Sequence, residues 1–128
     1  MDLNLKDRGR FVIVKHEHRD RPVHWDIMFE MKNNMLAAFR ADSDPLSLAE
    51  NGGGLEKIFD HDRKFLDYEG PVNNGLGSVT SCDAGIYGVS QVRSNALRMI
   101  LEGSVVSGSF SLSFEQDRWA IERVNRNS

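Results

Sequence analysis

The stretch FVIVKHEHRDRPVHWDIMFE holds three of the chain's four histidines, and the spacing of its polar residues could support metal chemistry. His16 and His24 lie in it, and Asp26 follows His24 by two positions. Imidazole nitrogens and carboxylate oxygens bind Mn²⁺, Zn²⁺ or Fe²⁺, and a set of three leaves positions open for water or a phosphate oxygen. The fourth histidine, His61, lies in FDHDRKFLDYEG. These four side chains are the first candidates for a functional site.

The segment 23–31 (VHWDIMFEM) predicts a β-strand, in which successive side chains point to opposite faces. One face carries only apolar side chains and is expected in the core: Val23, Trp25, Ile27, Phe29 and Met31. The other face carries His24, Asp26, Met28 and Glu30. His24 and Asp26 can therefore bind one ion together, and His16, at the end of a strand at 10–16, can supply a third ligand. The spacing alone also fits a solvated strand face with a chance His-x-Asp.

Short apolar runs joined by turn residues predict the elements that must position these side chains. Strands are expected at 10–16, 23–31, 35–40, 96–102, 109–114 and 118–124, with a turn at 32–34 and a short helix around 46–50. The pattern predicts a mostly β fold, a small antiparallel β-barrel with one or two short helices. Residues 1–128 are expected to form a single domain with a core of about 8–125. The predicted core contains Trp25, Ile27, Phe29, Phe110, Leu112, Phe114, Trp119 and Ile121.

Composition narrows the classes of function and of partner. The net charge is −3 and the pI about 5.8, which disfavours a broad basic surface for nucleic acid and leaves local contact with a strand end. Cys82 is the single cysteine, so neither an internal disulfide nor a thiolate metal site is expected. The sequence shows no signal peptide and no apolar run long enough to cross a bilayer. We therefore expect a cytoplasmic monomer that does not associate with membranes.

Several strings, in order along nearly the whole chain, carry a resemblance to a known family: RFVIVKH, HWDIMFE, LDYEG, CDAGIY and GSFSLSFEQDRWAIERV. Together they resemble the 3′-phosphoesterase domain of bacterial DNA ligase D and its short stand-alone relatives. The resemblance implies a compact β-barrel and a Mn²⁺-dependent enzyme of DNA repair by non-homologous end joining. Such an enzyme removes a terminal ribonucleoside and then the 3′-phosphate from DNA or primer–template 3′ ends, leaving a 3′-OH for ligation.

Matching the motifs residue by residue assigns roles to the four candidate side chains. The resemblance implies that His16, His24 and Asp26 bind the metal, Mn²⁺ or another divalent transition metal such as Zn²⁺. It implies that His61 contacts the scissile phosphate, either holding it or protonating the leaving oxygen. His18 also sits at the family's spacing from His24, so it is the alternative first ligand; the strand pattern before His16 favours His16.

Two positions depart from the family pattern at the expected phosphate site. Met28 stands where the ligase domains carry an arginine, and Phe65 stands where they carry a tyrosine. Both lost groups would hydrogen-bond the phosphate, and an arginine also offsets developing charge. Arg63, two residues after His61, is a candidate substitute cation, and it fits an exposed loop arginine equally well.

Three acidic residues could tune the site from behind the ligands: Glu30, Asp67 and Glu69. Asp67 and Glu69 fit equally well as caps of the turn in YEGPVNNG.

Besides the phosphoesterase, two other functions stay open. One is a catalytically weak or inactive module that binds a 3′ end and recruits a DNA ligase or polymerase. The other is a metal enzyme that acts on a different phosphorylated substrate.

Overall fold

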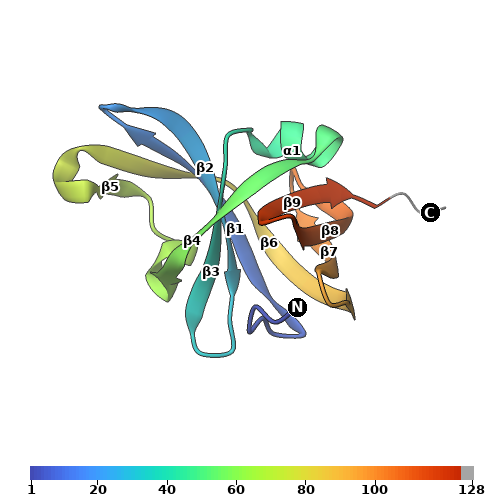
Figure 1. The fold of residues 1–128 in the computed structure, drawn as a ribbon. Coiled ribbons are helices and arrows are strands. Elements are labelled where there is room, and N and C mark those ends of the chain that lie inside the picture. Colours follow the sequence, from blue (N-terminus) through green and yellow to red (C-terminus); the bar gives the residue numbers. More distant parts are fainter. Residues whose placement is uncertain (125–128) are drawn as a thin grey trace.

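The computed structural model describes residues 1–124 as one closed antiparallel sheet with short helical segments between strands (Figure 1). Its elements, in chain order, are β1 (Arg8–His18), β2 (Arg21–Glu30), β3 (Met35–Ala41), α1 (Pro45–Asn51), β4 (Gly53–Asp62), the 3₁₀ turn η1 (Arg63–Leu66), β5 (Gly70–Val72), the 3₁₀ turn η2 (Asn73–Gly75), β6 (Gly77–Val92), β7 (Ala96–Gly103), β8 (Ser107–Glu115) and β9 (Arg118–Arg123). The predicted mostly β fold is confirmed. The predicted strand at 118–124 extends one residue beyond β9. The predicted core ends at residue 125, which lies outside the described residues.

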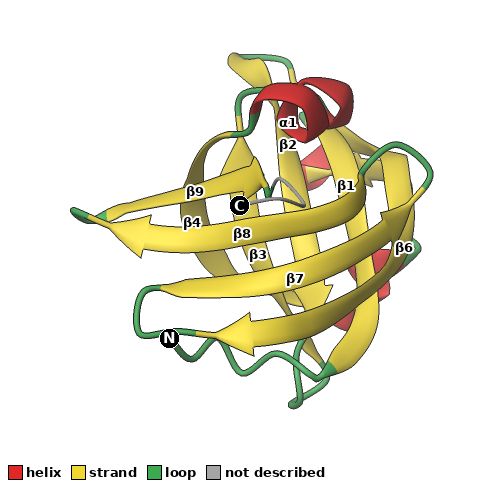
Figure 2. Cartoon of the chain, turned by 90° about the vertical axis from the view of Figure 1, so that its right-hand side faces the viewer, coloured by secondary structure: helices red, strands yellow, loops and turns green. Residues whose placement is uncertain are grey.

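The sheet closes on itself, which gives it the form of a barrel. The strand order is β1-β2-β3-β4-β9-β8-β7-β6, and β6 pairs back with β1, so eight strands form a ring with β5 added on β6. Every pairing between these strands is antiparallel. Figure 2 shows the strands curving around the ring with α1 across one end. Closure leaves few unpaired strand edges, the usual reason that small antiparallel sheets form barrels.

The interior of the ring is filled by one hydrophobic cluster. Alternate residues of β1, β2 and β3 point into it, and β6 to β9 supply most of the rest: among its members are Phe11, Ile13, Ile27, Phe29, Phe39, Tyr87, Met99, Leu101, Phe110, Leu112 and Ile121. Because side chains alternate along a strand, the other faces of β1, β2 and β3 must point out of the ring. That outer face carries the candidate site.

The outer face of β1, β2 and β3 is also buried, which differs from the solvated face that spacing alone allowed. A second hydrophobic cluster lies on it: Val12, Val14, Met28, Leu36, Ala38, Leu66 and Val79. Leu66 of η1 and the partly buried Phe65 and Val72 cover this cluster. The segment from the end of β4 to β5 therefore packs over one side of the sheet. It shields the polar residues beside the cluster from solvent.

The short helix and the hairpin turn form where the sequence predicted them. The side chain of Asp44 caps α1 by accepting a hydrogen bond from Ser47 N–H, and Pro45 occupies the first turn. Gly52 ends the helix with φ of +67°, a conformation that favours glycine. The turn between β2 and β3 is closed by the bond from Met31 N–H to the Met35 carbonyl. This turn sets the register of β3 against the site strand.

Most of the predicted core is buried, but two apolar residues are not. Ile27, Phe29, Phe110, Leu112 and Ile121 are buried, and Trp25 and Trp119 are partly buried against the same cluster. The predictions for Phe114 and Val23 were wrong, since these side chains are 37% and 39% exposed. Both lie near strand ends, Phe114 one residue before the end of β8 and Val23 near the tip of the β1–β2 hairpin, where fewer neighbouring strands remain to cover them.

Within residues 1–124, no helix has the length and apolar character that crossing a membrane requires.

Candidate metal site

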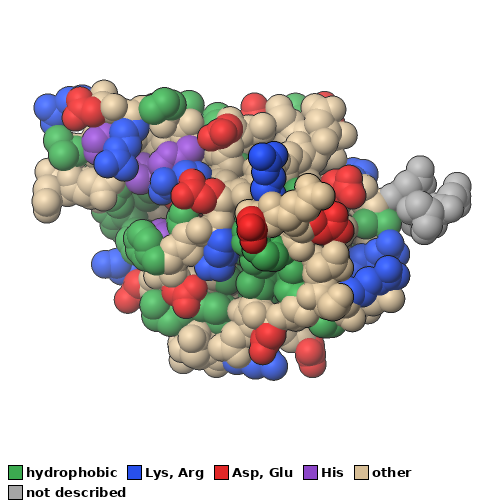
Figure 3. All heavy atoms as spheres, viewed as in Figure 1, with side chains coloured by type: hydrophobic (Ala, Val, Ile, Leu, Met, Phe, Trp, Pro, Cys, Tyr) green, Lys and Arg blue, Asp and Glu red, His purple; other side chains and the backbone are tan. Residues whose placement is uncertain are grey.

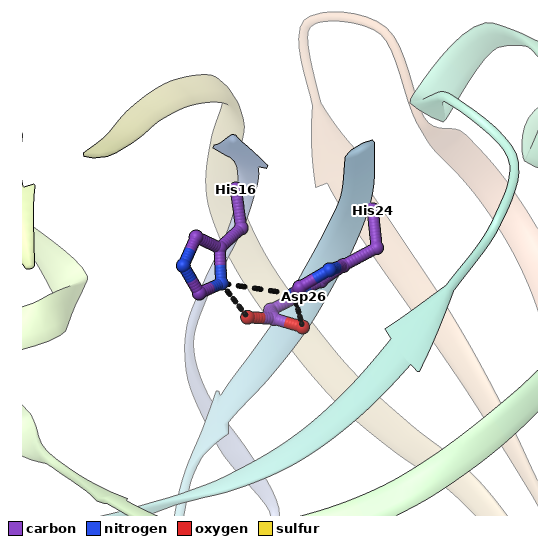
Figure 4. A group of neighbouring side chains, drawn as sticks. All are labelled: His16, His24 and Asp26. Atoms are coloured by element: carbon purple, nitrogen blue, oxygen red, sulfur yellow. Dashed lines mark hydrogen bonds and ion pairs between the residues drawn. The ribbon is translucent and has the colours of Figure 1, made fainter. Parts of the chain in front are cut away.

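The register of β1 and β2 brings the three predicted ligands together. His16 on β1 pairs directly with His24 on β2, and Asp26 lies two residues further along the same face of β2. Figure 4 shows the two imidazoles and the carboxylate pointing toward one another from these two strands. Adjacent strands of a sheet hold paired side chains rigidly, so the convergence follows from the backbone. His18 lies outside this group, because its Nδ1 accepts a hydrogen bond from Asp20 N–H at the hairpin tip.

The three potential ligand atoms lie close enough to share one ion. His16 Nδ1 and His24 Nε2 are 2.9 Å apart, His24 Nε2 is 3.5 Å from Asp26 Oδ1, and His16 Nδ1 is 3.8 Å from Asp26 Oδ2. An ion bound at roughly 2.0–2.2 Å by each atom keeps its ligands about 3 to 3.5 Å apart. The His16–His24 and His24–Asp26 separations match this range, and the His16–Asp26 separation, measured to the other carboxylate oxygen, is slightly longer. Two nitrogens with a carboxylate oxygen suit Mn²⁺, Zn²⁺ or Fe²⁺.

A buried carboxylate atom without a partner supports the same conclusion. Asp26 is only 3% exposed, and its Oδ1 has no hydrogen-bond partner among residues 1–124. Leaving such a group unsatisfied costs about 1–3 kcal/mol, and few buried polar groups in native proteins are left so. A bound cation would satisfy this oxygen. The residues present therefore fit a metal ion by their geometry and by the chemistry of the donor atoms.

Arg40 is the cation closest to the site, and sequence reasoning missed it. It lies on β3 directly opposite Asp26. Its Nε is 3.5 Å from Asp26 Oδ1, an ion-pair distance, yet the described residues offer this buried nitrogen no hydrogen-bond acceptor. The register could have revealed it, because a hairpin with its turn at 32–34 places residue 40 opposite residue 26. Arg40 thus presents an unused donor beside the three candidate ligands.

The surroundings of His16 and His24 favour the neutral form that binds a metal ion. Burial is the main cause that lowers the pKa of His16 and of His24 below the ordinary value. The charge of Arg40 acts in the same direction on both rings, and Asp26 opposes it. The lowered pKa values favour the neutral imidazoles that bind metal ions, and an ion would replace the hydrogen bond between His16 Nδ1 and His24 Nε2.

A cavity of about 550 Å³ opens beside these ligands and contains the remaining predicted histidine. His61 and the predicted ligands line it, together with two arginines, Arg21 and Arg40, and two further carboxylates, Asp60 and Asp62. Its apolar wall includes Val14, Met28, Phe65 and Val79. Figure 3 shows histidine side chains gathered at one end of this face of the molecule, with Lys and Arg side chains and exposed hydrophobic atoms around them. The cavity therefore combines histidines, arginines and carboxylates with an apolar wall.

The ring of His61 is held in a defined orientation in this cavity. Its Nδ1 lies 2.9 Å from the Phe59 carbonyl oxygen, to which a protonated Nδ1 donates. The ring stacks on Phe59 and meets the edge of Phe65. With Nδ1 engaged by the backbone, Nε2 remains to contact a ligand or to carry a proton.

Arg63, the predicted substitute cation, is directed elsewhere. Its guanidinium donates to Glu30 Oε2 through both Nε and Nη2, the latter at 2.8 Å. It is not among the residues that line the cavity. Glu30 itself accepts from Arg10 N–H at 2.7 Å, so it anchors neighbouring elements and touches none of the three candidate ligands. The structure therefore brings neither Arg63 nor Glu30 to the metal group.

The two other acidic residues proposed to act from behind the ligands also bind elsewhere. Asp67 Oδ1 accepts from the Arg10 guanidinium at 2.6 Å, an exposed ion pair that lowers the pKa of Asp67. Glu69 Oε2 accepts from Ser81 N–H on β6 at 3.0 Å. Both side chains fasten the covering segment to the strands beneath it. This favours a structural role for Asp67 and Glu69 over an effect on a bound ion.

Comparison with models of known protein families finds no match for this chain. Comparison with curated proteins also finds no match.

Proposed function

We propose that this protein is a metal-dependent phosphoesterase that removes a 3′-phosphate, and a 3′-ribonucleoside, from DNA or primer–template ends in DNA repair. The observation that carries the proposal is the convergence of His16, His24 and Asp26 beside the unpaired Nε of Arg40. The cavity next to them also contains His61, and the ordered sequence resemblance to the ligase D domain points to the same chemistry.

The charge balance of the site supports an anionic substrate. The cavity lining has two arginines, Arg21 and Arg40, against three carboxylates, Asp26, Asp60 and Asp62, so a divalent ion on the three ligands would change its charge from negative to positive. Such an ion, Mn²⁺ in the family resembled, would supply Lewis-acid polarisation of a phosphoryl oxygen and a lowered pKa for a bound water. Local positive charge of this kind recognises one phosphate group and does not require a long basic surface.

Arg40 and His61 are the side chains that we assign to the phosphate. Arg40 lines the cavity with a side chain that is 31% exposed, and a guanidinium fits two phosphate oxygens at once. It would replace the arginine that the family carries at position 28. His61, with Nδ1 held by the Phe59 carbonyl, has Nε2 free to hold the phosphate or to protonate the leaving oxygen.

The apolar wall of the cavity leads us to expect slow turnover. Met28 is 1% exposed and packed in the second hydrophobic cluster, and Phe65 lies against the same cluster. Neither can donate a hydrogen bond to a phosphate. Losing one charge-assisted bond to the transferring group costs about 3 kcal/mol, on the order of a hundredfold in rate. Ribonucleoside removal should be slower still, because it also requires an oriented sugar hydroxyl.

A second candidate, favoured by this same wall, is a module that binds a 3′-phosphate end without cutting it. Such a module would recruit a DNA ligase or polymerase to the end. In either case we propose that the protein acts as a monomer in the cytoplasm. The single Cys82 suits a reducing compartment.

Conversion of a 3′-phosphate primer–template to a 3′-OH end, with and without Mn²⁺, tests the proposal. We expect slow conversion that requires Mn²⁺ and is lost in Asp26→Ala. Glu102→Ala, which removes an exposed carboxylate on β7, is the matched control and should convert the end at the wild-type rate. If wild type and Asp26→Ala are equally inert while both bind the 3′-phosphate end, the enzyme is excluded and the binding module takes its place.

A further inference from the structure

Phe59 on β4 is a large apolar side chain in an unusual position. It is 76% exposed, the highest value among the exposed large hydrophobic side chains of the described residues. It lines the cavity that contains the candidate metal ligands and His61. A single exposed hydrophobic residue is ordinary on a protein surface, but an aromatic ring at the mouth of a polar site is open to a ligand.

The backbone of β4 is irregular where it presents this ring. Leu36 of β3 pairs with His61, whereas Ala38 pairs with Ile58, so two residues of β4 face Ala37 alone. The two are Phe59 and Asp60, and the register shift marks a β-bulge. A bulge bends its strand and redirects side chains, and bulges are frequent next to active sites. The bulge therefore sets the direction of Phe59 and His61 together.

The ring of Phe59 has one face covered and the other open. Its plane is nearly parallel to that of His61, at 10° and with 4.6 Å between centroids. Phe65 also packs on His61 in an edge contact, with 5.7 Å between ring centroids. His61 thus supports Phe59 from one side, and the high exposure of Phe59 means that its other face is free. A rigid aromatic face stands beside the side chain that we assign to the phosphate.

We propose that Phe59 is a stacking platform for the terminal nucleobase of a 3′-phosphorylated strand. This inference rests on the proposed function, because it takes the phosphate at His61 and Arg40 as the fixed point. One sugar separates the 3′-phosphate from the base of the same nucleotide, so a base is the part of the ligand that reaches the neighbouring ring. Every nucleobase has a π-face, so the platform accepts any terminal base. A local grip of this kind also explains how an acidic chain holds a strand end without a basic surface.

Binding of end analogues tests the platform without turnover. The probes are 5′-fluorescein oligodeoxynucleotides that end in a non-hydrolysable 3′-methylenephosphonate, with either adenine or an abasic tetrahydrofuran residue at the last position. Fluorescence anisotropy gives Kd for each probe with wild type, Phe59→Ala and Phe59→Trp. Phe114→Ala is the matched control, because Phe114 is also exposed but lies on β8, outside the cavity lining.

We expect wild type and Phe114→Ala to bind the adenine probe about tenfold more tightly than the abasic probe, as stacking of one base predicts. Phe59→Ala should bind both probes equally, and Phe59→Trp should restore the preference. A preference that survives in Phe59→Ala, or that is absent from wild type, overturns the platform.

A third probe with an unmodified 3′-OH end separates this inference from the proposed function. If wild type prefers the phosphonate ends over the 3′-OH end but ignores the base, the phosphate site stands and the platform is wrong. If wild type binds the adenine probe no better than the 3′-OH probe, the phosphate assignment fails and the platform fails with it. Turnover is measured separately, so a base preference in a protein that does not cut supports the platform and the binding module together.

Discussion

Two buried carboxylates lie on the same face of β2, four residues apart, and their surroundings differ completely. Glu30 accepts hydrogen bonds from Arg10 N–H and from the Arg63 guanidinium, and Lys6 adds an ion pair at 3.7 Å. Asp26 has Arg40 at ion-pair distance, but its Oδ1 finds no hydrogen bond in the part of the chain that the structure describes. Burial does not distinguish the two carboxylates, because Glu30 is 5% exposed and Asp26 is 3% exposed.

The difference indicates which carboxylate serves the fold and which serves a ligand. A buried charge stabilises a protein only when donors surround it, and Glu30 meets that condition with the Arg10 backbone N–H, the Arg63 guanidinium and the Lys6 ammonium. Asp83, another buried carboxylate, meets it with backbone N–H groups of residues 104, 105 and 106. Asp26 instead faces two imidazoles whose nearest nitrogens lie 3.5 and 3.8 Å from its oxygens, too far for good hydrogen bonds. We infer that its missing partner is the metal.

The largest expected effect comes from removing a metal ligand from the end of β2 that carries Asp26. His24→Ala should lower Mn²⁺-dependent turnover on the order of a thousandfold, because one of three ligands is lost. His18→Ala should lower it by less than about tenfold, since this side chain lines the cavity without joining the ligand group. Initial rates on a 3′-phosphate primer–template measure both. A loss in His18→Ala as large as that in His24→Ala would reassign the first ligand from His16 to His18.

Removing the carboxylate of Glu30, at the other end of β2, should affect the stability of the fold and not the binding of the ion. Glu30→Ala leaves Arg10 N–H and the Arg63 guanidinium without their acceptor, so we expect unfolding to become easier by about 3 kcal/mol. Urea titration followed by circular dichroism measures this change. Asp26→Asn in metal-free protein should change stability by less than about 1 kcal/mol, because the charge it removes is poorly satisfied. Equal losses of stability in Glu30→Ala and Asp26→Asn would mean that the two carboxylates have the same structural role.

Substitution of Arg40 should change the binding of cation and anion in opposite directions. Arg40→Met removes a positive charge beside the ligands, so Mn²⁺ should bind a fewfold more tightly. A non-hydrolysable 3′-phosphonate end should bind about tenfold more weakly, because a charge-assisted contact is lost. Calorimetry with each ligand measures the two affinities. Weaker binding of both ligands would show that Arg40 only supports the structure of Asp26.

The smallest effect concerns acid stability and depends on Glu30. Burial alone would raise the pKa of Glu30, but the Arg10 and Arg63 hydrogen bonds and the charge of Lys6 outweigh burial and lower it. A carboxylate whose pKa is lower in the folded state stabilises the fold above its unfolded pKa, and that contribution is lost as pH falls through the folded pKa. The melting temperature should therefore decrease below about pH 4.5, and Glu30→Gln should show a shallower decrease. Parallel pH profiles for the two proteins would contradict this assignment.

The alternation of β2 and its neighbours made much of this site predictable. A period of two placed His24 and Asp26 on one face, and the pattern before His16 indicated the adjacent strand. The same reasoning could have found Arg40 through the hairpin register. It could not show that the polar face is buried, because burial depends on Leu66 and Phe65, which fold over the face from a segment some forty residues away in the chain.

Two of the ring strands were not predicted, and both have physical reasons. β6 is rich in Ser and Gly and has no regular alternation, since it pairs with β1, β5 and β7 along different parts of its length. Gly85 in β6 is required by close approach, because a side chain there would collide with the Glu102 carbonyl. β4 carries the bulge that interrupts its period at Phe59. Sequence patterns fail where a strand changes partners or gains a residue.

Mn²⁺ binding to purified wild type, Asp26→Asn and Glu30→Gln tests the central claim most directly. Electron paramagnetic resonance of free Mn²⁺ during titration gives stoichiometry and affinity for each protein. We predict one Mn²⁺ per chain in wild type and in Glu30→Gln, and loss of that site in Asp26→Asn. Equal Mn²⁺ binding by wild type and Asp26→Asn, or loss of the site in Glu30→Gln with Asp26→Asn unaffected, would contradict the assignment of Asp26 as the metal-binding carboxylate.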